Sequence, residues 1–287
     1  MPFNRLQAVV PGIKPLSVSA PFGNYVQPAG CTATLGTFTL ASRPGRVKQI
    51  VKTVRYYPRL KAWVNKIGLR NPGLGWVERK AAAGNLDLSD KLVSIHGFTE
   101  NDWAGLIDRL ARLGPMGMEL NMSCPNVGHI DWPRGLFERA VATGVPVVVK
   151  LPPVNYDEMA EMAFAQGVRA FHCCNTLPVP AGGMSGWPLK PVALQCVREL
   201  RGRAWGGDVA IVGGGGVRSA AELDEYDAAG ADGFAIGTIT MNPVLLLSHA
   251  RVRPIREYAE ALARRTPEAA TPTPTPTSTP TAGAPHD

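Results

Sequence analysis

The stretch "VAIVGGGGVRSAAELDEYDAAGADGFAIGT", Val209 to Thr238, shows the unit from which most of the chain is predicted to be built. An apolar run at 209–213 leads into glycines, a helical pattern follows at 218–229, and a second apolar run covers 232–237. Continuous apolar runs are typical of parallel strands that are buried on both faces. The stretch therefore predicts a strand, a helix and a second, parallel strand.

The same alternation extends toward the N-terminus. The helix predicted over 99–114 shows it best, because Thr99 can cap its start, Trp103, Leu106, Ile107 and Leu110 fall on one face, and Gly114 ends it. About eight such strand–helix units predict an α/β protein with a (β/α)8 TIM barrel. Further strands are predicted at 16–20, 31–38, 91–97, 116–121, 144–150 and 168–174, and further helices near 157–166, 190–201 and 243–264.

Two regions depart from this alternation. Residues 39–90 have an irregular pattern and are predicted to form a long insertion after the second strand. From Thr266 the chain alternates threonine and proline, which offers no apolar face, so 266–287 are predicted to be a disordered tail. One folded domain, residues 1–265, remains.

The composition limits the ligands, metal sites and cell compartment that can be expected. The 287 residues carry a formal charge of +7, which suits anionic ligands, although the basic residues of 43–66 are spread widely enough to form an ordinary solvated face. The five cysteines lack zinc or iron–sulfur spacing, so no metal site is predicted and a reducing compartment, the cytoplasm, is expected. Neither a signal peptide nor a membrane span is expected.

Polar residues follow the predicted strands. Asn121 and Lys150 each end a strand, and Asn175 and Thr176 come just after another. In barrel enzymes the active site lies at the C-terminal ends of the strands, so these side chains should meet at one mouth. The last two strands end in glycine-rich turns, at Gly214 and Gly215 and at Gly237 and Thr238.

Each of these features has a functional and a structural interpretation. The glycines could cradle a phosphate or simply allow tight turns. Lys150 could sit beside an electron-rich cofactor ring or extend to the solvent. The carboxamides of Asn65, Asn121, Asn126 and Asn175 could together bind a pyrimidine, or each could belong to a turn.

Cys124, in the loop after Asn121, could transfer protons or be a small buried thiol. His96 and His172 lie on predicted strands and are expected to be core or supporting groups. The sequence does not assign a role to His129, which lies a few residues beyond Cys124.

Several motifs, in order along the chain, resemble the dihydroorotate dehydrogenase family. Among them, "ELNMSCPNVG" (119–128) and "VVVKLPP" (147–153) are the most specific in combination. The resemblance covers roughly 16–247, and its other motifs are "VSAPFG" (18–23), "NKIGLRNPG" (65–73), "CCNT" (173–176), "GGMSGWPLKPVAL" (182–194), "IVGGGGVRSAAELDEYDAAGAD" (211–232) and "FAIGT" (234–238).

The resemblance implies an FMN-dependent barrel that oxidises dihydroorotate to orotate in pyrimidine biosynthesis. Cys124 would be the base, with hydride passing to the flavin, and a cysteine here is similar to the soluble class, which forms homodimers or pairs with an electron-transfer subunit. Asn65, Asn121, Asn126, Asn175 and Thr176 would bind the substrate. FMN would contact Ser19, Ala20, Lys150, Ser185, Gly186, Gly214, Gly215, Gly237 and Thr238.

One departure bears on the substrate. The family carries a lysine at the end of the second strand, where this chain has "TATLGTFTL" with Leu35 or Gly36 in its place; Arg43, Arg46 or Lys48 could compensate. Two alternatives therefore remain. One is a flavin barrel for another dihydropyrimidine, similar to dihydropyrimidine dehydrogenase or a tRNA-dihydrouridine synthase, although "SCPN" and the lack of a following helical domain argue against nucleic acid. The other is a flavin-binding paralogue with weak activity.

Overall fold

The computed structural model describes residues 2–122, 132–241 and 249–265, and eight parallel strands there close into a barrel. The predicted TIM barrel is confirmed. The strands, in their order around the barrel, are β1 (Leu16–Val18), β12 (Gly233–Ile236), β11 (Ala210–Gly214), β8 (Ala170–Cys173), β7 (Val147–Lys150), β6 (Gly117–Asn121), β5 (Lys91–Ile95) and β2 (Thr32–Phe38).

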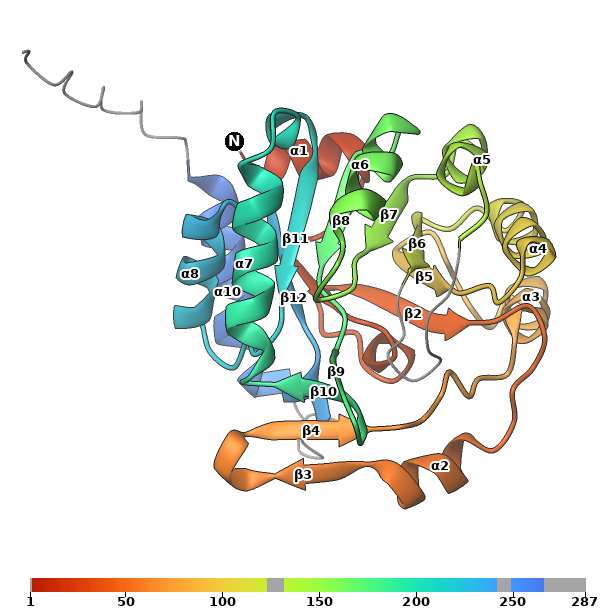
Figure 1. Cartoon of the computed structure of the whole chain (residues 1–287), viewed down its shortest axis with the longest axis horizontal. Coiled ribbons are helices and arrows are strands. Elements are labelled where there is room, and N and C mark those ends of the chain that lie inside the picture. The colour runs from red at the N-terminus through yellow and green to blue at the C-terminus, as the bar shows by residue number, and fades with distance from the viewer. Residues whose placement is uncertain (1, 123–131, 242–248, 266–287) are drawn as a thin grey trace, which may run out of the picture.

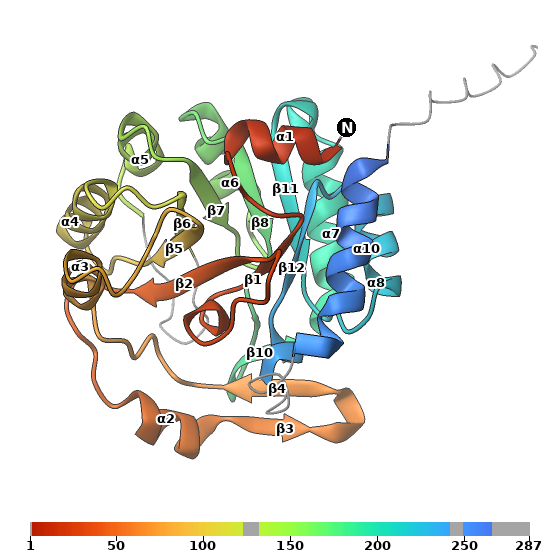
Figure 2. The same ribbon diagram turned by 180° about the vertical axis from the view of Figure 1, so that it is seen from behind.

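Helices cover the outside of the barrel (Figures 1 and 2). In the chain, an α-helix comes between each barrel strand and the next except between β1 and β2, which are joined through the 3₁₀ turn Phe22–Asn24. The main core lies between strands and helices. The helices are α3 (Leu74–Ala82), α4 (Glu100–Ala111), α5 (Leu136–Ala142), α6 (Asp157–Ala165), α7 (Leu189–Arg201), α8 (Ala221–Ala229) and α10 (Arg253–Arg264).

The helix α4 forms as its sequence predicts. The Thr99 hydroxyl accepts a hydrogen bond from the backbone N–H of Asp102 at 3.1 Å, which satisfies one of the free N–H groups at the helix start. The predicted apolar face, from Trp103 to Leu110, is buried. The last helix is shorter than predicted, because α10 begins only at Arg253.

Residues 39–90 form the predicted insertion, between β2 and β5, but it is not irregular as its sequence pattern suggested. Besides α3, the region contains α2 (Arg46–Thr53), β3 (Arg55–Tyr57) and β4 (Ala62–Asn65). The last two join β9 (Leu177–Val179) and β10 (Gly182–Gly186) in an antiparallel sheet of order β3-β4-β10-β9. This small sheet lies across the C-terminal end of the barrel, at the bottom of Figure 1.

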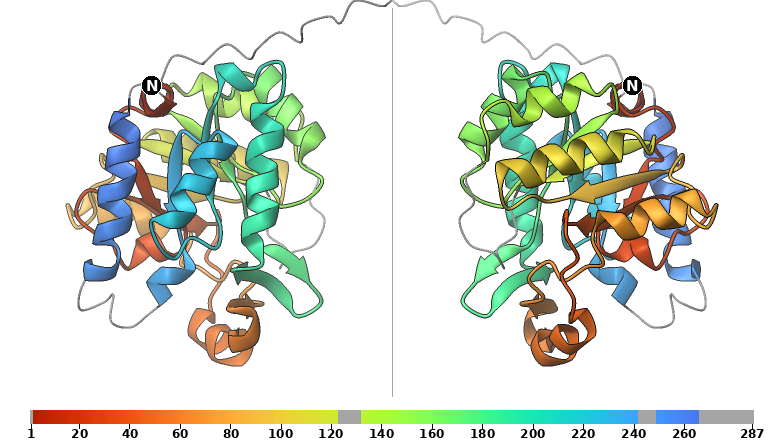
Figure 3. Two further views of the ribbon diagram at one scale, coloured as in Figure 1. Left: turned by 90° about the vertical axis from the view of Figure 1, so that its left-hand side faces the viewer. Right: turned by 90° about the vertical axis from the view of Figure 1, so that its right-hand side faces the viewer.

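The opposite end is closed by α1 (Pro2–Val9), which the sequence did not predict (Figure 3). Phe3 and Leu6 of α1, with Val10 and Ile13 after it, pack against apolar residues inside the barrel such as Val148. The contact is close, since a Cβ on Gly233 would lie 2.5 Å from the Leu6 side chain. The interior therefore has an apolar floor at its N-terminal end.

Removing part of this floor should destabilise the barrel. Leu6 is 1% exposed, so Leu6→Ala leaves a cavity and should lower the free energy of unfolding by about 2–5 kcal/mol. Gln7→Ala, on the exposed side of α1, is the control and should change it by less than about 0.5 kcal/mol. Equal effects in urea unfolding would mean that α1 does not seal the barrel.

Candidate active site

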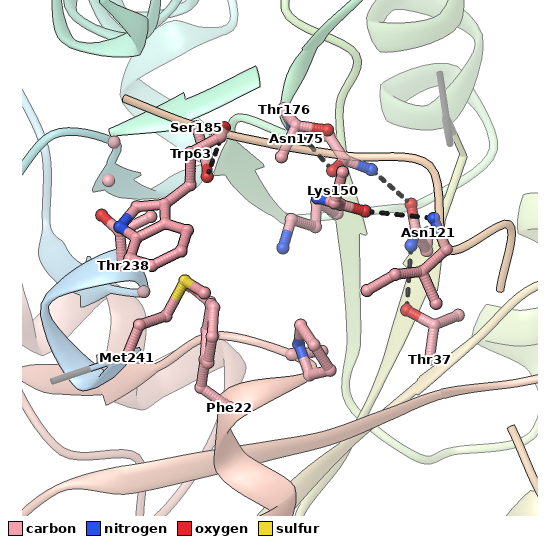
Figure 4. Close-up of a pocket in the computed structure, with 18 of the residues that line it drawn as sticks. Phe22, Thr37, Trp63, Asn121, Lys150, Asn175, Thr176, Ser185, Thr238 and Met241 are labelled. Carbon is pink, nitrogen blue, oxygen red and sulfur yellow. Dashed lines mark hydrogen bonds between the residues drawn. The ribbon is translucent and has the colours of Figure 1, made fainter. Parts of the chain in front are cut away.

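A cavity of about 370 Å³ opens at the C-terminal end of the barrel, beneath the small sheet (Figure 4). Its size falls in the range of small-molecule sites. Every predicted site residue that the structure describes lines it: Ser19, Ala20, Asn65, Asn121, Lys150, Asn175, Thr176, Ser185, Gly186, Gly214, Gly215, Gly237 and Thr238. Cys124, Asn126 and His129 lie outside the described residues, as does the predicted tail.

A chain of hydrogen bonds orients the carboxamides (Figure 4). The Asn175 side-chain amide accepts from the backbone N–H of Thr176 at 2.8 Å and donates to Asn121 Oδ1 at 2.8 Å. Asn121 Nδ2 in turn donates to Thr37 Oγ1 at 2.9 Å, and Thr37 pairs with the Ser94 hydroxyl at 3.0 Å. Because each amide has fixed partners, the donors and acceptors that face the cavity are also fixed.

Sheet register explains why Asn121, Lys150 and His172 lie together. Asn121 is paired with Lys150, and Lys150 with His172, on three adjacent strands. Residues in register on parallel strands point to the same face, here the barrel interior. Lys150 is 5% exposed, and its side chain extends toward the middle of the cavity (Figure 4).

Beneath this layer lies Glu119, two residues before Asn121 and fully buried. Burial opposes ionisation of its carboxyl, yet the Lys150 ammonium and hydrogen bonds from His172 and Ser94 outweigh burial and lower the Glu119 pKa to about 2. Burial and Lys150 lower the pKa of His172, so its ring is neutral at pH 7. Neutral His172 donates through Nδ1 to Glu119 at 2.8 Å, and the carboxylate balances the charge of Lys150.

The Glu119 carboxylate should make stability depend on pH. A carboxyl whose pKa is lowered by folding contributes stability that is complete above its ordinary value of 4.5 and is lost as the pH falls toward 2. The free energy of unfolding in urea should therefore drop more between pH 7 and pH 3 in the native chain than in Glu119→Gln. Parallel pH profiles for the two proteins would show that the carboxylate is not preferentially stabilised by folding.

The loop after β4 carries an organising residue that the sequence did not reveal. Buried Asn71 accepts from the backbone N–H of Gly73 at 2.8 Å and donates to the Leu69 carbonyl at 2.7 Å. Leu69 has φ +54°, a left-handed conformation that side chains rarely adopt, and it lines the cavity. Asn71 thus holds the loop that begins at Asn65.

The glycine turns fit both interpretations given by the sequence. Gly215 has φ +137°, and a Cβ on it would press on Leu189 of α7 at 3.1 Å, so the turn itself requires glycine. A Cβ on Gly214 would lie 2.7 Å from the Ala235 carbonyl oxygen. Close backbone at the ends of β11 and β12, without side chains, leaves room for a phosphate, and the residues present fit an FMN.

An apolar wall faces Lys150 across the cavity. Figure 4 shows Trp63 of β4 with Met241 and Phe22 on this side. The sequence reasoning missed all three. Trp63 lies two residues before Asn65 on the same strand, and this spacing, which puts both on one face, could have identified it.

The described residues contain no cluster of three or more potential metal ligands. Within the same part of the chain, no helix is long and apolar enough to cross a membrane.

Comparisons with known proteins agree with this geometry. The family model described as dihydroorotate dehydrogenase matches residues 25–245. The "Dihydroorotate dehydrogenase B (NAD(+)), catalytic subunit" of Latilactobacillus sakei subsp. sakei (strain 23K) is 31% identical over 71% of this chain and 75% of its own. The "Dihydroorotate dehydrogenase A (fumarate)" of Limosilactobacillus reuteri (strain DSM 20016) is 28% identical over 68% of this chain and 76% of its own. In fold, the chain is similar to ligand-free DHODH from Eimeria tenella, with a TM-score of 0.64 at 19% identity over 85% of this chain and 82% of that one.

Proposed function

The chain belongs to the dihydroorotate dehydrogenase family, and we propose that it oxidises dihydroorotate to orotate, a step of pyrimidine biosynthesis, with bound FMN. The observation that carries the proposal is the set of oriented carboxamides beside Lys150 in one cavity. Amides can pair with the ring N–H and C=O groups of a dihydropyrimidine. A cation such as Lys150 favours the electron-rich state of a reduced cofactor.

In this proposal the chain's own residues bind and deprotonate the substrate. Asn65, Asn121 and Asn175, with Asn126 and Thr176, hold the pyrimidine. Cys124, as a thiolate, takes the proton from C5, and the C5–C6 double bond forms as hydride leaves C6. Bound FMN would accept that hydride.

The cofactor would lie between two groups of residues. Ser19, Ala20, Lys150, Ser185 and Gly186 surround the part of the cavity proposed for the flavin ring. Gly214, Gly215, Gly237 and Thr238 would hold its phosphate at the ends of β11 and β12.

We further propose that a separate electron-transfer subunit removes the electrons. The support is that the relative with 31% identity is named as the catalytic subunit of an NAD(+) enzyme, whereas the fumarate enzyme shares 28%. Cys31, Cys173, Cys174 and Cys196 are all free and buried, which fits a reducing compartment, so we place the enzyme in the cytoplasm.

One experiment tests cofactor and substrate together. The protein, purified and reconstituted with FMN, is mixed without oxygen with dihydroorotate, and the visible flavin absorbance should bleach. A colourless protein that retains no FMN would overturn the proposal. A yellow protein that does not bleach would instead indicate a binding paralogue, and salt-sensitive RNA binding would favour a dihydrouridine synthase.

A further inference from the structure

Among the described residues, the charged side chains that line the cavity are all positive. They are Lys150 inside the barrel, Arg46 at the start of α2 and Arg70 after the loop that begins at Asn65. No aspartate or glutamate lines the cavity in the described part of the chain. Because the buried Glu119 carboxylate balances Lys150, Arg46 and Arg70 are the lining cations of the described residues that remain to favour an anionic ligand.

The end of β2 contributes no cation to this set. Gly36 lines the cavity with φ +105°, and a Cβ on it would lie 2.4 Å from the Ser94 carbonyl oxygen. The Asn24 side chain brackets Gly36, accepting from its N–H at 3.0 Å and donating to its C=O at 2.7 Å. The backbone here therefore leaves no room for a side chain of any kind.

Arg46 is connected to Gly36 through Tyr25 and Asn24. Its guanidinium carbon is 5.1 Å from the ring centroid of Tyr25, which also lines the cavity and directly follows Asn24. An arginine stacked on a ring keeps its in-plane N–H groups for a ligand. Arg46 has no acidic partner among the described residues.

The other basic residues of this region are less suited to bind an anionic ligand in the cavity. Arg43 is stacked 4.6 Å from Phe98, donates to the Gly68 carbonyl and is absent from the lining. Lys48 is exposed on α2 and is also absent from the lining. Arg70 lines the cavity but donates to the Pro44 carbonyl at 3.2 Å, next to the start of α2, which gives it a supporting position.

We infer that Arg46 binds the carboxylate of the substrate and so selects an anionic dihydropyrimidine over a neutral one. The inference rests on the proposed function and names a substrate contact within that site. The carboxamides can pair with the ring amides of any dihydropyrimidine, whereas a carboxylate away from water needs a cation. A guanidinium can bind it with two parallel hydrogen bonds.

The test uses the FMN-loaded enzyme, dihydroorotate and the neutral analogue 5,6-dihydrouracil. Arg46→Ala should raise the KM for dihydroorotate and the Kd for orotate, read from the flavin spectrum, roughly 10- to 100-fold. Reduction of the flavin by dihydrouracil, however slow, should not change. Arg46→Lys should recover part of the loss, because the charge returns without the paired geometry. Lys48→Ala, on the same helix but outside the cavity, is the matched control and should behave as the native enzyme.

The outcomes separate this inference from the proposed function. If the native enzyme neither binds orotate nor is reduced by dihydroorotate, the proposed function fails and the inference fails with it. If the native enzyme binds orotate and Arg46→Ala binds it equally well, the inference alone is overturned. Equal losses toward dihydroorotate and dihydrouracil would also overturn it, since they would indicate a structural role.

Discussion

Cys124→Ala should slow reduction of the flavin by dihydroorotate by roughly 10²- to 10⁴-fold, the range expected when a positioned base is removed. FMN content should not change, because Cys124 is assigned to the substrate. Cys124→Ser should retain part of the activity, with its pH profile moved to higher pH, because a hydroxyl gives up its proton less readily than a thiol. Stopped-flow absorbance without oxygen measures both variants.

Cys31→Ala is the matched control for a general effect of losing a thiol. Cys31 is 4% exposed, and burial raises its pKa to about 11, so it cannot serve as a base near neutral pH. In the Cys31→Ala variant, dihydroorotate should reduce the flavin at the native rate. If Cys124→Ala also keeps the native rate, Cys124 is not the base and the proposed mechanism is wrong.

Lys150→Met should impair both stability and flavin reduction. It leaves the Glu119 carboxylate buried without its main positive neighbour, which should lower the free energy of unfolding by about 3–5 kcal/mol. It also removes the cation proposed to stabilise reduced flavin, so the flavin's reduction potential should fall. Urea unfolding and a redox titration of the FMN-loaded protein measure the two effects.

A double variant separates the two effects of Lys150. Lys150→Met with Glu119→Leu removes both charges, so much of the stability should return while flavin reduction stays slow. Lys190→Met is the control, because Lys190 pairs with exposed Glu225 and the loss should stay below about 1 kcal/mol. A double variant as unstable as Lys150→Met alone would show that Glu119 does not depend on Lys150.

The barrel could be predicted from the sequence because its strands are encoded locally. Most are short apolar runs, and in α4 the cap at Thr99 and the buried face were also predicted correctly. The small sheet could not be predicted in this way. Its strands have three to five residues, and β3 is exposed throughout, so no apolar pattern marks it. Trp63 pairs with Ser185, far along the chain, and local patterns hold no information on such pairing.

The candidate site, too, could be predicted from the sequence only in part. Asn121 and Lys150 could be placed because the ends of parallel strands in a barrel meet at one mouth. Glu119 was missed because it lies within the apolar strand β6, and its burial makes sense only once strand order puts Lys150 and His172 beside it. The choice among Arg43, Arg46 and Lys48 also needed the structure, because the sequence does not show that only Arg46 of the three lines the cavity.

The floor formed by α1 also governs exchange with the solvent. Apolar residues fill the barrel between α1 and the Glu119 layer, so ligands have no passage through that end. Among the described residues the cavity lies at the C-terminal end, beneath the small sheet, and this end is the route left for dihydroorotate, orotate and displaced water. Substrate and product would then share this route, so orotate has to leave before the next dihydroorotate enters.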